Sequence, residues 1–313
     1  MKAAFIKEYG DSSQLVVGEL AKPTIQPHQV LIKVVASAIN PVDFHVRNGM
    51  AKDSGIHTLP LVLGWDVSGV VEQVGSEVEG LQKGDSVLAF TPVSEQGTNA
   101  EYVATSSELV IKKPKDMSFI EAAGLPLASV TAYQAIEQME VSSGDTMLIH
   151  NASGAVGAFA VQIAKALGVR VIATASKPKH ELVKGWGADL VYAYEDKSWQ
   201  VNQSVDATLV AIGNDEIIKQ SLVATKGGGW VISTLNELPE GEATKHAINF
   251  ERMWVSNSKE QLEKVVELYN RKQLIVPIDT VLPLDLVKYA HQRSEQYLAV
   301  GKIVLSIDPL RKF

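Results

Sequence analysis

The chain of 313 residues contains no cysteine. This absence excludes disulfide bonds, thiolate nucleophiles, and zinc or iron–sulfur sites held by cysteine. A metal site would have to be built from histidine and carboxylate groups, but none of the seven histidines forms a close ligand pair such as H-E-x-x-H. We therefore expect no metal site.

The sequence also has little positive charge and no long apolar run. Its formal net charge is −7, which does not favour binding to nucleic acid or to an anionic membrane. No apolar run approaches the length that a bilayer span requires, and the stretch MKAAFIKEYG at 1–10 is more typical of a first strand than of a signal peptide. We expect a cytoplasmic protein with neither nucleic acid nor a membrane as partner.

The residues that are present describe a globular protein, since 46% are hydrophobic and 21% are charged. The length predicts two domains, each able to bury a core of its own. Residues 1–117 are rich in β-branched residues, glycine and turn signals, as in SGVVEQVGSEVEGLQKGDSVLAF at 68–90. This pattern predicts a compact and mostly antiparallel β domain.

From Ser118 the chain alternates between predicted helices and strands. Ser118 and Glu121 form a capping-box pattern at the start of this region. Strands are expected at TMLIH (146–150), VRVIATA (169–175), LVYAY (190–194), ATLVAI (207–212) and WVIST (230–234). Such alternation over 118–257 predicts a parallel sheet covered by helices on both faces. An amphipathic helix opens 258–313, and the two strand-like runs after it are expected to return to the first domain.

The turn NASGAVG at 151–157 follows one of these strands and precedes a helical run. Glycine at 154 and 157 would let a pyrophosphate approach the backbone and let the helix pack closely on the sheet. The N–H groups of the first helical turn can bind a phosphate. The complete G-x-G-x-x-G pattern is missing, so the alternative is a structural turn that binds no phosphate. The predicted cofactor-binding residues of this turn are Asn151, Ser153, Gly154, Ala155, Val156 and Gly157.

The choice of cofactor depends on the residues about 20 positions after the turn. An NAD site places an acid there, but this chain has Ser176, Lys177 and His180, and its first acid is Glu181. Hydroxyl and cationic groups suit a 2′-phosphate, and two charge-assisted hydrogen bonds would favour NADPH over NADH by about a hundredfold. The alternative is a solvated lysine pair at the start of a helix. We predict NADPH.

Several stretches, in order, carry a resemblance to a known family. They are NPVDFHVRNG (40–49), LPLVLGWDVSGVVEQVG (59–75), GDSVLAF (84–90), AEYV (100–103), AAGLPLASVTAYQAI (122–136), the turn at 151–157 and GKIVL (301–305). Together they resemble the zinc-free quinone oxidoreductase branch of the medium-chain dehydrogenase/reductase family over almost the whole chain. The resemblance implies an α/β protein with a GroES-like β domain at 1–117, completed by 258–313. It also implies a Rossmann domain with a doubly wound parallel sheet at 118–257, a cleft between the domains and a homodimer.

The departures from the zinc enzymes of this family indicate the chemistry. Those enzymes have Gly-His-Glu where this chain has Gly64, Trp65 and Asp66. No Lewis acid would remain to polarise an alcohol. The hydride acceptor must then be electron-poor already, as quinones and α,β-unsaturated carbonyls are.

The resemblance also implies roles for individual residues. Asn40, His45 and Thr131 are the predicted catalytic residues, and Asn40, His45 and Trp65 would line the substrate pocket. Further cofactor contacts are expected from Asn40, Pro41, Thr131, Tyr194, Ile212 and Gly213.

Each of these roles has a structural alternative. Asn40 would cap the turn before Pro41, and His45 would be a satisfied polar residue. Thr131 and Trp65 would pack in the core. Asp43 and Arg47 are four residues apart and would pair on a short helix.

The sequence thus predicts a zinc-independent, NADPH-dependent oxidoreductase that transfers hydride to a small-molecule quinone or enone. One alternative is an enoyl or alkenal reductase with a narrow substrate range. The other is a non-catalytic NADPH-binding sensor or structural protein.

Overall fold

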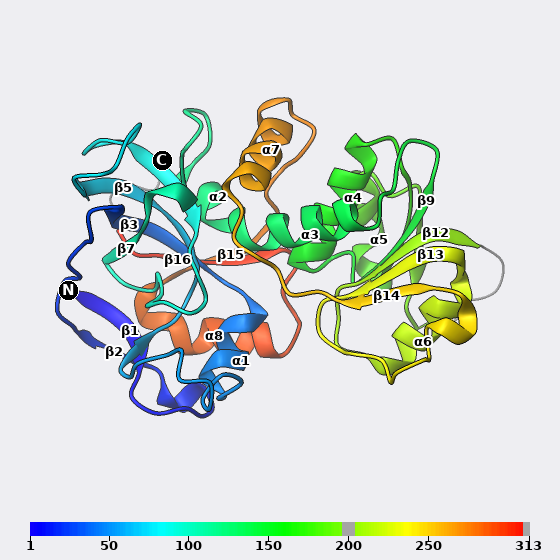
Figure 1. The fold of residues 1–313 in the computed structure, drawn as a ribbon, viewed down its shortest axis with the longest axis horizontal. Coiled ribbons are helices and arrows are strands. Elements are labelled where there is room, and N and C mark those ends of the chain that lie inside the picture. Colours follow the sequence, from blue (N-terminus) through cyan, green and yellow to red (C-terminus); the bar gives the residue numbers. More distant parts are fainter. Residues whose placement is uncertain (196–203, 309–313) are drawn as a thin grey trace. The chain divides into compact units, whose positions relative to one another are not determined.

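The computed structural model describes residues 1–195 and 204–308 (Figure 1). The chain forms two compact units. Unit 1 consists of Met1–Leu127, Asn257–Glu263 and the residues from Val276 on, and unit 2 consists of Ala128–Ser256 and Lys264–Ile275. In the described part of the chain no helix is both long enough and apolar enough to cross a membrane.

Unit 1 is built on a seven-stranded sheet with the path β15-β16-β3-β5-β6-β8, in which β7 pairs with β3. Its strands are β3 (Gln29–Ile39), β5 (Asp66–Val74), β6 (Ser86–Phe90), β7 (Tyr102–Ser106), β8 (Val110–Lys112), β15 (Ile278–Pro283) and β16 (Lys302–Ser306). All pairings are antiparallel except that of β15 with β16. A second, three-stranded sheet consists of β2 (Val16–Glu19), β1 (Lys2–Ile6) and β4 (Leu61–Val62). The predicted antiparallel character is confirmed, and the last two strands, β15 and β16, belong to this sheet.

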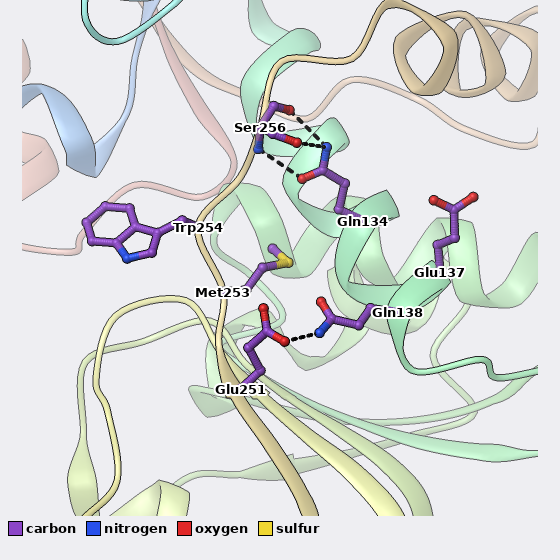
Figure 2. A pocket seen from close by; sticks show the side chains of 7 residues that line it. All are labelled: Gln134, Glu137, Gln138, Glu251, Met253, Trp254 and Ser256. Carbon is purple, nitrogen blue, oxygen red and sulfur yellow. Dashed lines mark hydrogen bonds between the residues drawn. The ribbon is translucent and has the colours of Figure 1, made fainter.

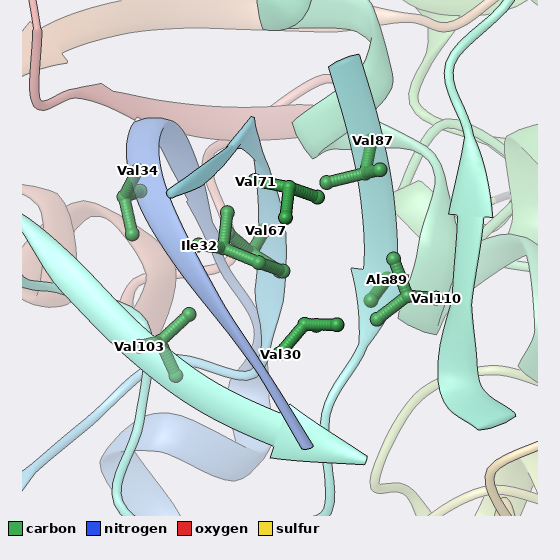
Figure 3. Close-up of a cluster of buried hydrophobic side chains, with 9 residues drawn as sticks. All are labelled: Val30, Ile32, Val34, Val67, Val71, Val87, Ala89, Val103 and Val110. Atoms are coloured by element: carbon green, nitrogen blue, oxygen red, sulfur yellow. The ribbon is translucent and has the colours of Figure 1, made fainter. Parts of the chain in front are cut away.

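The core of unit 1 follows from the β-branched residues of its strands. Figure 3 shows nine buried side chains, seven of them valine, that converge from β3, β5, β6, β7 and β8. Side chains alternate between the two faces of a strand, so every second residue of these runs reaches the same core. Burial of a valine side chain contributes roughly 1.5–3 kcal/mol, so this cluster stabilises the sheet.

Three short helices belong to unit 1: α1 (Pro41–Arg47), α2 (Phe119–Gly124) and α8 (Val287–Glu295). The predicted capping box at the start of α2 is confirmed. The Ser118 amide donates to Glu121 Oε2 over 2.9 Å, and the Glu121 amide donates to Ser118 Oγ over 3.2 Å. These bonds satisfy two N–H groups that a helix end otherwise leaves unpaired.

Unit 2 contains a six-stranded sheet with the order β11-β10-β9-β12-β13-β14. The strands are β9 (Thr146–His150), β10 (Arg170–Ala175), β11 (Leu190–Ala193), β12 (Val205–Val210), β13 (Thr225–Ser233) and β14 (Asn249–Arg252), and every pairing is parallel. Counted from β9, this is the order of a doubly wound, Rossmann-type sheet. The predicted fold class is confirmed.

The helices of unit 2 cover both faces of this sheet. α4 (Ala155–Ala166) and α5 (His180–Gly185) connect β9, β10 and β11, whereas α6 (Asp215–Ala224) connects β12 and β13. Right-handed crossovers in opposite directions from the centre place α6 on the other face from α4 and α5, as Figure 1 shows. Two further helices are α3 (Pro126–Gln138) and α7 (Lys259–Asn270).

Two features of the sheet were not predicted. β13 begins at Thr225, five residues before the run WVIST, and β14 has the sequence NFER. The first half of β13 contains three successive glycines, and β14 alternates between exposed and half-buried residues. Neither segment has the apolar run by which a buried strand is recognised.

Candidate functional site

The turn between β9 and α4 lies where the strand order reverses. Asn151, the first residue after β9, has a left-handed backbone with a φ of 55°. Its Nδ2 donates to the carbonyl oxygen of Ala211 over 2.9 Å. Ala211 directly follows β12, so this bond joins the carboxyl ends of the two central strands. Ligands of doubly wound sheets bind at such a switch point.

A side chain at Gly157 would clash with the backbone of Asn151, and one at Gly154 would displace the Asn151 side chain. A Cβ at Gly157 would lie 2.3 Å from the carbonyl oxygen of Asn151, and a Cβ at Gly154 would lie 2.7 Å from Asn151 Nδ2. Gly154 is the N-cap of α4 and contributes no capping side chain. The first turn of this 12-residue helix contains no acid. Its N–H groups and dipole therefore suit a phosphate, and the residues present fit a dinucleotide.

The carboxyl end of β10 carries hydroxyl and cationic groups. Ser176 is half-buried, and Lys177 is exposed and begins a 3₁₀ turn that leads into α5. His180 is half-buried, and its Nε2 lies 3.1 Å from the carbonyl oxygen of Ala175. Glu181 is exposed and pairs with Lys184 over 2.8 Å. No carboxylate therefore follows β10 directly, and the edge suits the 2′-phosphate of NADPH.

The parallel pairing of β11 with β10 brings Tyr194 to the same edge. Tyr194 directly follows β11, and its side chain is exposed.

The carboxyl end of β12 holds the next two predicted residues. Ile212 packs against the apolar cluster beside α6, and Gly213 is exposed. A Cβ at Gly213 would lie 3.0 Å from Asn236 Oδ1, so this loop approaches the one that follows β13. Thr131 lies buried in α3, and Ser153 lies buried in the turn before α4.

His150 is a residue to which sequence reasoning gave no role. It ends β9, it is buried, and its Nδ1 lies 3.0 Å from Thr174 Oγ1 on β10. Burial lowers the pKa of His150 to about 3. The ring is therefore neutral at ordinary pH and links two strands beneath the turn.

In unit 1 Asn40 belongs to a buried polar cluster. Its Nδ2 donates to Asp66 Oδ2 over 2.8 Å, and its Oδ1 accepts from Lys302 Nζ over 2.5 Å. Lys302 Nζ also lies 2.9 Å from Asp66 Oδ2, and both of these side chains are fully buried. The amide of Asn40 is thus fixed at both ends by an ion pair.

Sequence reasoning did not find this ion pair. The available signal was a charge of each sign, at Asp66 and Lys302, in two apolar strand-like runs of the same predicted domain.

Asp43 and Arg47 do not pair, so that prediction is wrong. Arg47 is buried and donates to Glu295 Oε1 of α8, and its Nε donates to the carbonyl oxygen of Gly10 over 3.1 Å. Asp43 Oδ2 accepts instead from the backbone N–H of Asn40 over 3.0 Å. Burial raises the pKa of the Asp43 carboxyl to about 8. Arg47 lies in the last turn of α1, which contacts α8, so a carboxylate from α8 replaces the local partner.

His45 lies among aromatic side chains. It is half-buried, and the centre of its ring is 4.4 Å from that of Phe44. The ring of Phe44 meets the half-exposed ring of Tyr297 edge-on at 6.4 Å. Pro41, the first residue of this helix, is exposed.

Trp65 lies fully buried in unit 1. Its Nε1 donates to the carbonyl oxygen of Glu95 over 3.3 Å, and its ring stacks against His57 with a centre distance of 6.4 Å. This environment matches the alternative in which Trp65 is a core residue.

Comparison with known proteins places the chain in a family. The family models for the alcohol dehydrogenase GroES-like domain and the zinc-binding dehydrogenase match residues 26–115 and 186–305. The chain is 37% identical to 2-methylene-furan-3-one reductase of Solanum lycopersicum, over 99% of this chain and 80% of that protein. The chain belongs to the medium-chain dehydrogenase/reductase family. The predicted family is thereby confirmed.

Other members of the medium-chain dehydrogenase/reductase family are also similar. NADPH-dependent alkenal/one oxidoreductase of Arabidopsis thaliana is 35% identical over 97% of this chain and 79% of that protein. The structure of quinone oxidoreductase from Coxiella burnetii matches with a TM-score of 0.90 at 32% identity, over 98% of this chain and 99% of that one.

Some medium-chain dehydrogenase/reductases hold zinc, as the name of the second family model states. Within residues 1–195 and 204–308, no three His, Cys, Asp or Glu side chains are grouped so as to hold a metal ion. The independence from zinc stays a prediction.

Proposed function

We propose that the chain is a zinc-independent, NADPH-dependent oxidoreductase that transfers hydride to quinones or α,β-unsaturated carbonyls. The observation that carries the proposal is the glycine turn at 151–157, which leads into a helix with no acid in its first turn, together with a cationic rather than acidic group after β10. The names of the similar proteins, a quinone oxidoreductase and an NADPH-dependent alkenal/one oxidoreductase, support this substrate class.

In the proposed site, the protein binds and orients the cofactor through unit 2. The turn at 151–157 holds the pyrophosphate, and Ser176, Lys177, His180 and Tyr194 hold the adenosine end. Thr131, Ile212 and Gly213 lie along the nicotinamide end. When bound, NADPH supplies the hydride from C4 of its nicotinamide ring.

Unit 1 contributes the polar groups of α1. His45 donates a hydrogen bond to the acceptor oxygen that gains negative charge, which is the form of catalysis that a metal-free site requires. Asn40 is an orienting residue, since Asp66 and Lys302 fix its amide. Water supplies the final proton, so no side chain has to act as an acid.

A narrower alkenal or enone reductase is the second candidate, and the names of the two plant relatives favour it. The resemblance further supports a homodimer, and the cytoplasmic location stays a prediction. Light scattering would then report twice the chain mass of 33.8 kDa.

The test is oxidation of NADPH by chelator-treated protein, with a 1,4-quinone and a simple enone offered separately and NADH as the control cofactor. We expect turnover with NADPH, weaker turnover with NADH and no effect of the chelator. Turnover of the enone but not of the quinone would favour the second candidate, an alkenal or enone reductase with a narrow substrate range. Tight NADPH binding without turnover of either acceptor would contradict the proposal and favour a sensor or structural role.

A further inference from the structure

The segment that follows β14 exposes a large aromatic side chain. Trp254 is 61% exposed. The guanidinium carbon of Arg252 lies 3.4 Å from the centre of its indole ring, so the cation covers one face and leaves the other open. An exposed indole whose orientation is fixed by a neighbouring side chain can bind a flat ligand by stacking.

Contacts within unit 2 connect this pair to the carboxyl edge of the sheet. Arg252 Nε donates to the carbonyl oxygen of Leu235 over 3.0 Å. The next residue, Asn236, approaches Gly213, where a Cβ would lie 3.0 Å from its Oδ1. Gly213 belongs to the proposed nicotinamide end of the site. Trp254 is thus joined to that end through the loop after β13.

The segment that carries Trp254 also borders a surface hollow of about 340 Å³, and in Figure 2 the indole points away from the other side chains that line it. The hollow is lined by Gln134, Glu137, Gln138, Glu251, Met253, Trp254 and Ser256 (Figure 2). Four hydrogen bonds connect its walls. Gln134 Nε2 donates to the Ser256 carbonyl over 2.9 Å and to Ser256 Oγ over 3.2 Å, and the Ser256 amide donates to Gln134 Oε1 over 3.1 Å. Gln138 Nε2 donates to Glu251 Oε2. Ligand pockets begin at about this volume.

The hollow begins one helical turn from a predicted site residue. Thr131 and Gln134 are three residues apart on α3, so they lie on the same face of that helix. The α3 wall of the hollow therefore continues towards the proposed nicotinamide contact.

The open face of the indole suits a flat, conjugated ring. The Arg252 guanidinium occupies the opposite face and holds the indole in place, so a conjugated ring can stack on Trp254 without displacing it.

We propose that Trp254 and Arg252 determine acceptor specificity by binding flat, conjugated carbonyl ring systems, which makes ring quinones better acceptors than small acyclic enones. The inference rests on the proposed function and narrows its substrate class. Trp254 provides the stacking face, and Arg252 orients the indole from its opposite face.

The first experiment compares W254L and W254F with the wild type, using 1,4-naphthoquinone and 3-buten-2-one as acceptors at saturating NADPH. W254L is expected to lower kcat/KM for naphthoquinone tenfold or more and to change kcat/KM for butenone less than twofold. W254F keeps an aromatic face and is expected to retain at least a third of the naphthoquinone value. An equal loss with both acceptors, or no loss with either, would overturn the proposal.

The second experiment measures binding without turnover. Naphthoquinone is titrated into the protein in the presence of NADP⁺ while tryptophan fluorescence is recorded. Saturable quenching in the wild type and its loss in W254L are expected, and equal quenching in both would overturn the proposal. If the wild type turns over neither acceptor but W254L loses quenching, the proposed function fails and the binding site stands. If W254L changes the mass of the assembly and leaves the ratio of the two acceptors unchanged, a second copy covers Trp254 and the proposal fails.

Discussion

Among single residues, Asp43 has a carboxyl whose protonation is strongly altered by folding. Its pKa rises from 3.8 to about 8 because it is buried, although Lys302 and Arg47 act in the opposite direction. Between these values the folded protein keeps a proton that the unfolded chain releases. The contribution of Asp43 to the free energy of unfolding therefore falls as the pH rises from about 4 to about 8.

Asp43→Asn is expected to remove this dependence on pH. The asparagine cannot lose a proton, and its Oδ1 can still accept from the backbone N–H of Asn40. From pH 5 to pH 7 the variant should gain stability relative to the wild type by about 1 kcal/mol per pH unit. Urea unfolding at both pH values measures the gain, with the exposed Asp53→Asn as control. A constant difference between variant and wild type would contradict the raised pKa.

Lys177 is expected to distinguish the two nicotinamide cofactors. If it binds the 2′-phosphate, Lys177→Ala removes one charge-assisted hydrogen bond and raises the KM for NADPH roughly ten- to hundredfold. The KM for NADH should not change. Lys184→Ala is the matched control, since Lys184 pairs with Glu181 on α5. Equal effects of Lys177→Ala on both cofactors would rule out the assigned phosphate contact.

His45 is expected to act on the acceptor and not on the cofactor. His45→Leu should lower kcat for the quinone about 100-fold, as loss of an oxyanion donor does, and leave the Kd of NADPH unchanged. His45→Gln retains a donor and should recover part of the rate. The exposed His28→Leu serves as control. Full activity of His45→Leu would contradict the catalytic role and show that His45 only packs against Phe44.

Local pattern predicted the residues of the turn better than it predicted ion-pair partners. The glycines at 154 and 157 were found because a tight turn against a helix needs them, and a Cβ at either position would clash with Asn151. The partner of Arg47 was predicted wrongly because Glu295 lies 248 positions away in the sequence. The partners of Lys302 could not be predicted for the same reason. Asn40 and Asp66 become its neighbours only when β16 pairs with β3.

At the scale of elements, apolar runs located β9, β10, β11 and β12 within a few residues. The sequence did not predict the first half of β13 or any of β14, because their glycine and polar residues show no apolar periodicity. Their position comes from parallel pairing with neighbours that are themselves buried, which is a property of the sheet and not of the segment.

The packing of α4 on its turn gives a prediction for one element. Gly157→Ala would place a Cβ 2.3 Å from the Asn151 carbonyl oxygen and 2.7 Å from the Ala152 Cα, so the turn has to open. We expect weaker NADPH binding and a loss of roughly 1–3 kcal/mol in the free energy of unfolding. Titration of protein fluorescence with NADPH and thermal unfolding measure the two effects.

Gly185→Ala is the control within α5. A Cβ at that position meets nothing within 4 Å. This variant should bind NADPH normally and gain up to about 1 kcal/mol in stability, because alanine restricts the unfolded chain. Equal NADPH binding and stability of Gly157→Ala and Gly185→Ala would show that the close packing at Gly157 is not needed to maintain the cofactor-binding turn.

At the scale of the whole molecule, the fold class followed from motifs that occur in a fixed order along the chain. The sequence predicted only in outline that unit 1 is formed by separate segments of the chain. Unit 2 includes Lys264–Ile275, although the sequence had suggested a single C-terminal segment from 258 on. The boundary falls within α7, and a helix carries no compositional break at the point where its neighbours change.

Deleting the chain after residue 275 is expected to unfold unit 1 and spare unit 2. The deletion removes β16, which lies between β15 and β3, together with Lys302, the buried partner of Asp66. Hydrogen exchange should show lost protection in β3 and β5 and retained protection in β9 and β12. Retained protection in β3 would show that the N-terminal strands form a stable sheet without β16.

The position of β16 has a consequence for synthesis of the protein. The ribosome makes the strand that pairs with β3 long after β3 itself, when everything in unit 2 up to Ile275 has already been made. The Rossmann-type sheet can therefore form during translation, while residues 36–39 of β3 remain without their β16 partner on one edge for more than 250 residues. Unpaired strand edges promote association between chains, so the nascent N-terminal segment is the part of this molecule with the greatest need of a chaperone.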